Sequence, residues 1–201
     1  MILENKLGLT DQIELSKEEE RLSKIGAKEL FDSGKLDELE PGTFESLKII
    51  HKTLFDKVYN FAGVIRKENI AKGNFRFAPV LYLEESIKKI ESMPQATFDE
   101  IIEKYVEMNI AHPFREGNGR STRIWLDVIL KKQLKKAVDW SKVDKDKYLN
   151  AMVNSPVDDR EIKELLKSAL TDKISDREIY IKGIDYSYFY EGYKEYKTEE
   201  L

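Results

Sequence analysis

The residues that could do chemistry are concentrated between His112 and Arg123, in the stretch HPFREGNGRSTR. It contains a histidine, an acidic residue four positions later, a Gly-Asn-Gly turn and two arginines three positions apart. A neutral imidazole can accept a proton near neutral pH, and a carboxylate is a hard oxygen ligand that suits Mg²⁺. The arginines can each bind phosphate through two parallel hydrogen bonds. The stretch therefore indicates a site for a nucleotide polyphosphate beside a proton acceptor.

Backbone groups of the same stretch also suit a phosphate. Residues 116–119, Glu-Gly-Asn-Gly, stand just before an apolar pattern that predicts a helix over 118–136. The free N–H groups and the dipole at the start of a helix favour a bound anion. Gly117 and Gly119 let the backbone approach a ligand closely, and Asn118 between them can donate from its amide. We therefore expect this turn to cradle phosphate oxygens.

Two arginines and one carboxylate complete the set. Arg120 and Arg123 project from the first turn of the expected helix, where cations are electrostatically unfavourable. Their position indicates a bound anion or a nearby carboxylate. Glu116 can bind a Mg²⁺ ion that bridges phosphates, because this ion usually takes only one or two protein carboxylates. Taken singly, each of these residues is more often a helix cap, a turn residue or a solvated charge, but the combination favours a site.

The elements that must position these residues are mainly helical. Ser16 with Glu19, and Thr97 with Glu100, fit the capping box, which predicts helix starts near these residues. The second of these helices is expected to end at His112, because a proline follows. The fold class is therefore mainly α. Apolar residues at helical spacing predict the other helices over 43–61, 80–93, 118–136, 141–153, 158–170 and 176–197.

One segment departs from the helical pattern. Residues 63–80, GVIRKENIAKGNFRFAPV, alternate apolar and polar side chains around a Gly-Asn turn and predict a β-hairpin. A lone hairpin is marginally stable in water, so we expect it to lie against the helices. Its exposed edge could pair with an extended segment of another protein, or it could be an ordinary connection.

Composition limits the classes of function. The 201 residues carry a net charge of -4 and a pI near 5.5, which argues against nucleic acid as a partner. The chain has no cysteine, so disulfides, thiolate metal sites and cysteine nucleophiles are excluded. It shows neither an apolar run long enough to span a membrane nor a signal-peptide core. We expect one cytoplasmic domain that does not associate with membranes.

The stretch HPFREGNGRSTR resembles the Fic family, whose motif His-Pro-Phe-x-Asp/Glu-Gly-Asn-Gly-Arg-x-x-Arg it matches without a gap. The resemblance extends to residues 50–66, to FRFA at 75–78 and to RIWLD at 123–127. Most of residues 40–170 are similar to a Fic core, which implies a mainly α, Fic-like helical bundle with one β-hairpin flap. The activity implied is transfer of AMP from ATP to a Tyr, Thr or Ser hydroxyl of a target protein, with release of pyrophosphate.

The resemblance also implies roles for the motif residues. His112 is the general base, and Asn118 and Arg120 join it as catalytic residues. Glu116 holds Mg²⁺ between the α- and β-phosphates. Arg120 serves the β-phosphate side and Arg123 the γ-phosphate. The residues expected to bind the nucleotide are Gly117, Asn118, Gly119, Arg120 and Arg123.

Other residues near the motif are expected to dock the target or to pack. In the family the hairpin lays the target's segment beside the active site by main-chain pairing. Phe75, Arg76 and Phe77 occupy the corresponding positions here. His51, the other histidine, lies close to an apolar helical face and is expected to be a core residue, and Phe114 is expected to be a core anchor.

A second signal lies near the C-terminus, in DYSYFYEGYKEY. Ser187 and Glu191 stand four positions apart, so on a helix they share a face. They resemble the inhibitory motif Ser/Thr-x-x-x-Glu-Gly/Asn, whose C-terminal location marks the third Fic class. Glu191 is expected to pair with Arg123 at the γ-phosphate position. We expect residues 1–175 to form a Fic core with an N-terminal helical extension, and 176–201 to form an inhibitory helix packed on the core.

Two alternatives to AMP transfer stay open. One is metal-dependent removal of AMP from a modified protein, with Glu191 assisting water, and the other is a non-catalytic nucleotide-dependent binding module. Tyr188, beside Ser187, is a candidate for self-modification. The expected partner is a target protein docked on the hairpin, by family analogy a type II topoisomerase subunit, and a weak homo-oligomer is also open.

Overall fold

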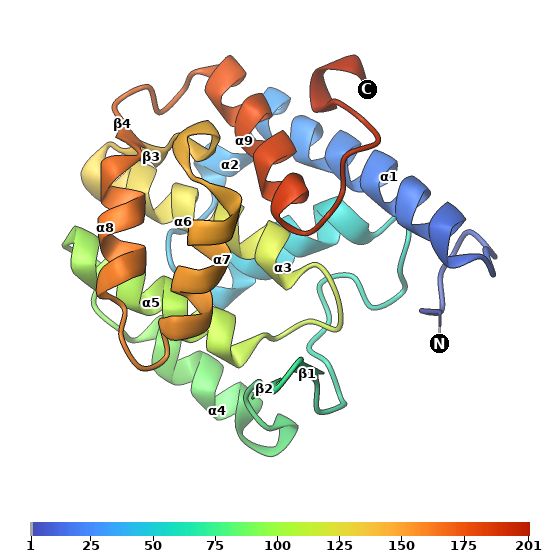
Figure 1. Ribbon diagram of the computed structural model, residues 1–201, viewed down its shortest axis with the longest axis horizontal. Helices are drawn as coiled ribbons and strands as arrows, with labels where there is room; N and C mark the ends of the chain where they lie inside the picture. The colour runs from blue at the N-terminus through green and yellow to red at the C-terminus, as the bar shows by residue number, and fades with distance from the viewer. Residues whose placement is uncertain (1) are drawn as a thin grey trace.

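Local signals in the sequence start the helices on either side of the motif. Thr43 accepts a hydrogen bond from Ser46 N at 3.2 Å and caps the helix that begins at Phe44, while Thr97 and Glu100 form a complete capping box at the helix that begins at Phe98. The computed structural model describes residues 2–201, and their mainly α arrangement, shown in Figure 1, confirms the predicted fold class. The α-helices are α1 (Gln12–Asp32), α2 (Lys35–Glu38), α3 (Phe44–Phe55), α4 (Val80–Glu91), α5 (Phe98–Ala111), α6 (Asn118–Leu134), α7 (Lys145–Asn154), α8 (Arg160–Ser168) and α9 (Arg177–Tyr190).

Helix α6 forms the centre of the bundle. It packs against α3 on one side and α5 on the other, and these helices contribute the fully buried side chains Ile50, Tyr105 and Trp125. α1 lies along α3, and α9 lies beside both α1 and α6 (Figure 1). α4 and α8 pack on α5, while α7 packs on α8 and α9. Over residues 2–201, no helix is both long and apolar enough to cross a membrane.

Helix α1 begins earlier than predicted. Its N-cap is Asp11, whose side chain accepts hydrogen bonds from two backbone N–H groups, so that the helix starts at Gln12. The capping box predicted from Ser16 and Glu19 is therefore wrong, since both residues lie inside the helix. Glu19 is buried, which leaves its carboxylate for a tertiary contact described below.

Helix α9 is shorter than the pattern over 176–197 indicates. Asp176 caps its start, and the helix ends at Tyr190. Gly192 has a φ of +94°, a conformation that favours glycine, and the chain turns there. The tail then runs back along α1, where two of its backbone N–H groups donate to Glu20. The tail that follows the end of α9 is thus attached to α1.

The predicted hairpin is present but short. β1 (Ala71–Lys72) pairs antiparallel with β2 (Phe75–Arg76). A hydrogen bond of 3.1 Å from Ala78 N to Ile110 O ties the segment after β2 to α5. The hairpin therefore lies against the helices, as expected.

A second small sheet was not predicted. β3 (Ala137–Val138), which follows α6, pairs antiparallel with β4 (Leu170–Thr171), which follows α8. Strands of two residues carry too little alternation to be recognised from sequence.

Candidate active site

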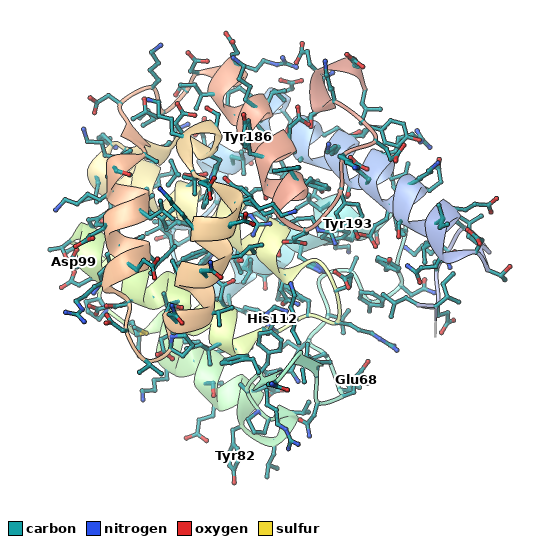
Figure 2. The ribbon with its side chains drawn as sticks, in the orientation of Figure 1. Glu68, Tyr82, Asp99, His112, Tyr186 and Tyr193 are labelled. Carbon is teal, nitrogen blue, oxygen red and sulfur yellow. The ribbon has the colours of Figure 1, made fainter. Side chains whose placement is uncertain are left out.

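The ends of two helices place the motif residues around one turn. His112 ends α5 in the left-handed conformation, with φ 50° and ψ 63°, and α6 begins at Asn118 after Gly117, with φ 75°. A Cβ at position 117 would lie 2.3 Å from the Phe55 ring, so conformation and space both require glycine. Figure 2 shows His112 beside the hairpin, where α5 ends. The turn brings this histidine and the start of α6 into one site.

His112 is held as a neutral imidazole. Its Nδ1 lies 3.1 Å from the carbonyl oxygen of Asn109, which assigns the hydrogen to Nδ1 and leaves the lone pair on Nε2. The Phe77 ring stacks on the imidazole with centroids 3.7 Å apart. Burial lowers the pKa of His112 to about 4, although the Asn109 carbonyl acts in the opposite direction. The side chain is therefore a free base at neutral pH, which its expected role requires.

Arg66 was not identified from the sequence, although it fixes the segment that carries His112. Its guanidinium donates to the backbone oxygens of His112 at 2.7 Å, Ala111 at 3.1 Å, Ala78 at 2.5 Å and Glu68 at 2.7 Å. These oxygens belong to the end of α5 and to the two flanks of the hairpin. Arg66 thus joins the hairpin to the end of α5, a role that no local sequence motif indicates.

Glu116 offers one partly exposed carboxylate at the start of α6. Its Oε1 accepts a hydrogen bond from Gly117 N at 2.9 Å and lies 3.1 Å from Arg120 Nη2, and its side chain is 40% exposed. Burial raises the pKa of Glu116, while Arg120 acts to lower it. Within residues 2–201 no group of three or more His, Cys, Asp and Glu side chains could hold a metal. A single carboxylate fits a Mg²⁺ ion that binds together with substrate phosphates.

The Asn118 side chain builds the turn. Its Oδ1 accepts from Phe114 N at 2.8 Å and its Nδ2 donates to Phe114 O at 2.7 Å. The Nδ2 group has a second N–H, so the donation from this amide to a phosphate stays a prediction. His51 supports the turn from α3, with Nε2 at 2.8 Å from Glu116 O and Nδ1 accepting from Gly63 N at 2.9 Å. His51 and Phe114 are both fully buried, which confirms the packing roles predicted for them.

Two residues of α9 bind Arg123. Its Nε donates to Ser187 Oγ at 2.6 Å and its Nη2 donates to Ser187 O at 2.8 Å. The same Nη2 lies 2.5 Å from Glu191 Oε1. Burial alone would raise the pKa of Glu191, but the charges of Arg123 and Arg120 outweigh burial and lower it. Glu191 is therefore ionised at neutral pH and paired with the arginine for which the sequence predicts a carboxylate partner.

Glu191 places this carboxylate over the first turn of α6. A Cβ at Gly119 would lie 2.3 Å from Glu191 Oε1 and 3.0 Å from Arg123 Nη1. Only glycine at position 119 leaves room for the contact. The first turn of a helix carries free N–H groups and a partial positive charge, which favour an anion. The carboxylate occupies the position in which we expect a phosphate.

Arg120 is enclosed by protein groups, and its Nε alone faces the anion position, so a contact with a ligand phosphate stays a prediction. Arg120 is fully buried, its Nη1 donates to Glu19 Oε1 at 2.6 Å and its Nη2 to Glu116 Oε1 at 3.1 Å. Its Nε lies 3.0 Å from Glu191 Oε2 without the alignment of a hydrogen bond. A buried guanidinium needs paired carboxylates, and Glu19 and Glu116 supply them. Glu19 precedes Arg120 by 101 residues, so local sequence could not identify the pair.

The remaining predicted residues lie in the hairpin and on α9. Arg76 is exposed, while Phe75 and Phe77 are half-buried. Tyr188 is only 1% exposed, in the contact between α9 and the rest of the bundle. The prediction that Tyr188 is modified does not fit this conformation, because a buried hydroxyl cannot reach a nucleotide.

Comparison with known proteins gives the same family as the motif. Residues 41–130 match the model of the Fic/DOC family. The chain is 32% identical over 170 residues to protein adenylyltransferase VbhT of Bartonella schoenbuchensis. The aligned region covers 77% of this chain and 34% of VbhT. It is 28% identical over 166 residues to the probable protein adenylyltransferase y4lH of Sinorhizobium fredii, with 77% of this chain and 83% of y4lH covered. The chain thus spans about a third of the first relative and most of the second.

A solved structure shares the fold. The BepC protein of Bartonella tribocorum, solved with bound AMPPNP, matches with a TM-score of 0.68 and 20% identity, covering 85% of this chain and 93% of that chain. At this identity the likeness concerns the arrangement of the helices alone.

Proposed function

The chain carries a Fic/DOC domain at residues 41–130, and from this premise we propose that it is a protein adenylylyltransferase inhibited by its own C-terminal segment. The reaction moves AMP from ATP to a Tyr, Thr or Ser hydroxyl of a target protein. One observation carries the proposal: the Glu191 carboxylate lies over the first turn of α6 and pairs with Arg123, in the same site as a neutral His112. Relatives named as adenylyltransferases support the activity.

The chemistry assigned to the chain is one displacement at phosphorus. The target's hydroxyl oxygen forms a bond to the α-phosphorus of ATP, and the bond from that phosphorus to the oxygen bridging to the β-phosphate breaks. The electron pair of the broken bond leaves with pyrophosphate. The hydroxyl proton goes to Nε2 of His112, which the contact between Nδ1 and the Asn109 carbonyl leaves unprotonated. The stacked Phe77 ring fixes the imidazole plane for this transfer.

The phosphates of ATP are assigned to the start of α6. Backbone N–H groups of the first turn and the Arg123 guanidinium supply positive charge that is in place before the reaction. Glu116 would hold Mg²⁺, which neutralises charge on the phosphates when bound. Arg120 lies behind this turn, with its Nε on the side where Glu191 now sits.

In this proposal Glu191 and ATP compete for the same positive charges. Arg123 uses Nε and Nη2 on Ser187 and Glu191, so it cannot hold the γ-phosphate at the same time. ATP bound without that contact leaves its α-phosphate misplaced, and a small misplacement can cost about 10²-fold in rate. Transfer therefore requires the Glu191 carboxylate to leave.

The hairpin is proposed to dock the target. Phe77 N donates to Ile70 O across the hairpin at 3.3 Å, and alternate residues of a strand face opposite edges. The backbone groups of Arg76 consequently face the edge of β2 that carries no strand. An extended segment of the target that adds there would bring a hydroxyl toward His112, whose ring contacts Phe77.

Labelled ATP tests the proposal. The Glu191→Gly variant should transfer label from the α-phosphate, and none from the γ-phosphate, to a protein of a bacterial lysate, and adding His112→Ala should remove the transfer. Transfer of the γ label, or no α label although ATP binds, contradicts the proposal. Release of AMP from a pre-labelled protein by the wild type and not by Glu191→Gly would favour the reverse reaction.

A further inference from the structure

Arg120 is enclosed by groups from opposite ends of the chain. One of them is Tyr193, which follows the end of α9 (Figure 2). Glu19 of α1 accepts from its Nη1 at 2.6 Å, and the Phe55 ring of α3 lies 4.8 Å from its guanidinium carbon. The C-terminal segment supplies the opposite side of the enclosure, with Glu191 and the rings of Tyr188 and Tyr193, whose centroids lie 5.3 and 4.6 Å from the same carbon.

Glu19 belongs to the fixed side of this enclosure. It lies within a helix of 21 residues that packs along α3, and it is 3% exposed. Its carboxylate accepts from Arg120, from Tyr193 OH at 2.7 Å and from Tyr59 OH. Moving it would leave a buried guanidinium and a buried hydroxyl without partners, which is costly.

Glu191 belongs to the side that can leave. It is the C-cap residue of α9, and its side chain is 19% exposed. Its Oε2 faces Arg120 Nε at 3.0 Å without a hydrogen bond, so its departure frees a donor that is aimed at the anion position. The other two nitrogens of the guanidinium, Nη1 and Nη2, keep their hydrogen bonds to Glu19 and Glu116.

We infer that Glu19 is a positioning residue that keeps Arg120 aimed at the nucleotide phosphates after Glu191 has left. The inference rests on the proposed function. It makes α1, which precedes the residues matched to the family model, a part of the nucleotide site. Because Glu19 acts through the guanidinium, the length of its side chain and its charge can be tested separately.

Two substitutions separate length from charge, both made in Glu191→Gly protein. Glu19→Gln keeps the length and an acceptor oxygen but removes the charge, whereas Glu19→Asp keeps the charge and is one methylene shorter. Glu20→Asp is the matched control, because Glu20 is the next buried carboxylate on α1 and pairs with Lys24 at 3.0 Å. Calorimetry measures the affinity for a non-hydrolysable ATP analogue and for AMP, and thermal unfolding verifies that each variant is folded.

Glu19→Asp should weaken binding of the ATP analogue by about 10-fold, the loss expected for one misplaced hydrogen bond to a charged group. Glu19→Gln should weaken binding less than Glu19→Asp does, because an acceptor oxygen still reaches the guanidinium. Glu20→Asp should retain the parent's affinity, and AMP, which lacks the β- and γ-phosphates, should bind equally to all. Undiminished binding by Glu19→Asp, or a loss in Glu19→Gln as large, overturns the inference and leaves the proposed function standing. If the shorter variant does not fold, Glu19→Gln decides, because a loss confined to the ATP analogue supports the inference, whereas no loss, or an equal loss for AMP, overturns it. A Glu191→Gly parent that binds no analogue overturns the proposed function and, with it, the inference.

Discussion

Arg123 Nη2 and Glu191 Oε1 lie 2.5 Å apart, although the two residues are separated by 68 positions in the sequence. The contact joins the start of α6 to the end of α9. The anion position at the helix start is therefore filled by a residue whose own place depends on the C-terminal segment. Any change that moves the end of α9 also changes which anion Arg123 can bind.

Ser187→Ala should raise AMP transfer, but less than loss of Glu191 does. The substitution removes the 2.6 Å hydrogen bond from Arg123 Nε and leaves the contact of Nη2 with the Ser187 backbone oxygen. One hydrogen bond to a charged group contributes about 1.5–3 kcal/mol, and the Glu191 pair remains to hold the arginine. Incorporation of α label into lysate proteins measures the effect. A rise as large as that of Glu191→Gly would show that the serine, and not the carboxylate, holds the inhibited state.

His112→Ala in Glu191→Gly protein should lower transfer by about 10²–10⁴-fold, the usual contribution of a general base. Affinity for a non-hydrolysable ATP analogue should stay the same, because the phosphates are assigned to α6 and the arginines. Label incorporation and calorimetry measure the two quantities on the same preparations. Transfer at the rate of the parent would remove His112 from the mechanism.

The imidazole of His112 should not titrate between about pH 8 and pH 5, because burial lowers its pKa to about 4. A base with a lowered pKa stays unprotonated until the pH falls through that value, so proton acceptance is retained over this range. Phe77→Ala exposes the ring to water and should move the midpoint upward, toward the ordinary value near 6.5. NMR of the histidine side chains follows the titration directly. A midpoint near 6.5 in the unmodified protein would contradict the burial argument.

Arg76→Pro should reduce labelling of a lysate target by about 10-fold, the effect of losing one recognition hydrogen bond worth about 1.4 kcal/mol. The change removes an N–H from the open edge of β2, while the hydrogen bond from Phe77 N to Ile70 O stays in place. Arg76→Ala is the control, since it removes the same side chain and keeps the N–H. ATP-analogue affinity should be equal in both variants. Equal labelling by the two would argue against docking by strand addition.

Signals that are local in sequence predicted the framework well. Thr43 and Thr97 cap their helices because an N-cap needs only the next three residues, and the motif fixes the turn before α6. The electrostatic argument that cations at a helix start need an anion nearby predicted a partner for Arg123, and the resemblance to the inhibitory motif identified Glu191 as that partner.

Contacts between distant segments could not be predicted in the same way. Ser16 and Glu19 fit a capping box, yet Asp11 is the N-cap of α1. Glu19 instead accepts a hydrogen bond from the guanidinium of Arg120 on α6. Arg66 binds four backbone oxygens without belonging to any motif. Such roles depend on which backbone and side-chain groups the fold leaves buried and unpaired, a property of the assembled structure.

Glu191→Gly tests the central claim most directly. The variant frees Arg123 without changing His112, Glu116 or the glycine turn, and a coupling of ~1–3 kcal/mol corresponds to a rise in transfer of roughly 5- to 150-fold. Arg123→Ala added to it should remove the gain, because the arginine that Glu191 occupies is also the one assigned to the γ-phosphate. The measurement is incorporation of α label at saturating ATP by wild type, Glu191→Gly and the double variant. Inhibition by Glu191 predicts activity in the single variant alone; a single variant no more active than wild type, or a double variant as active as the single, would contradict it.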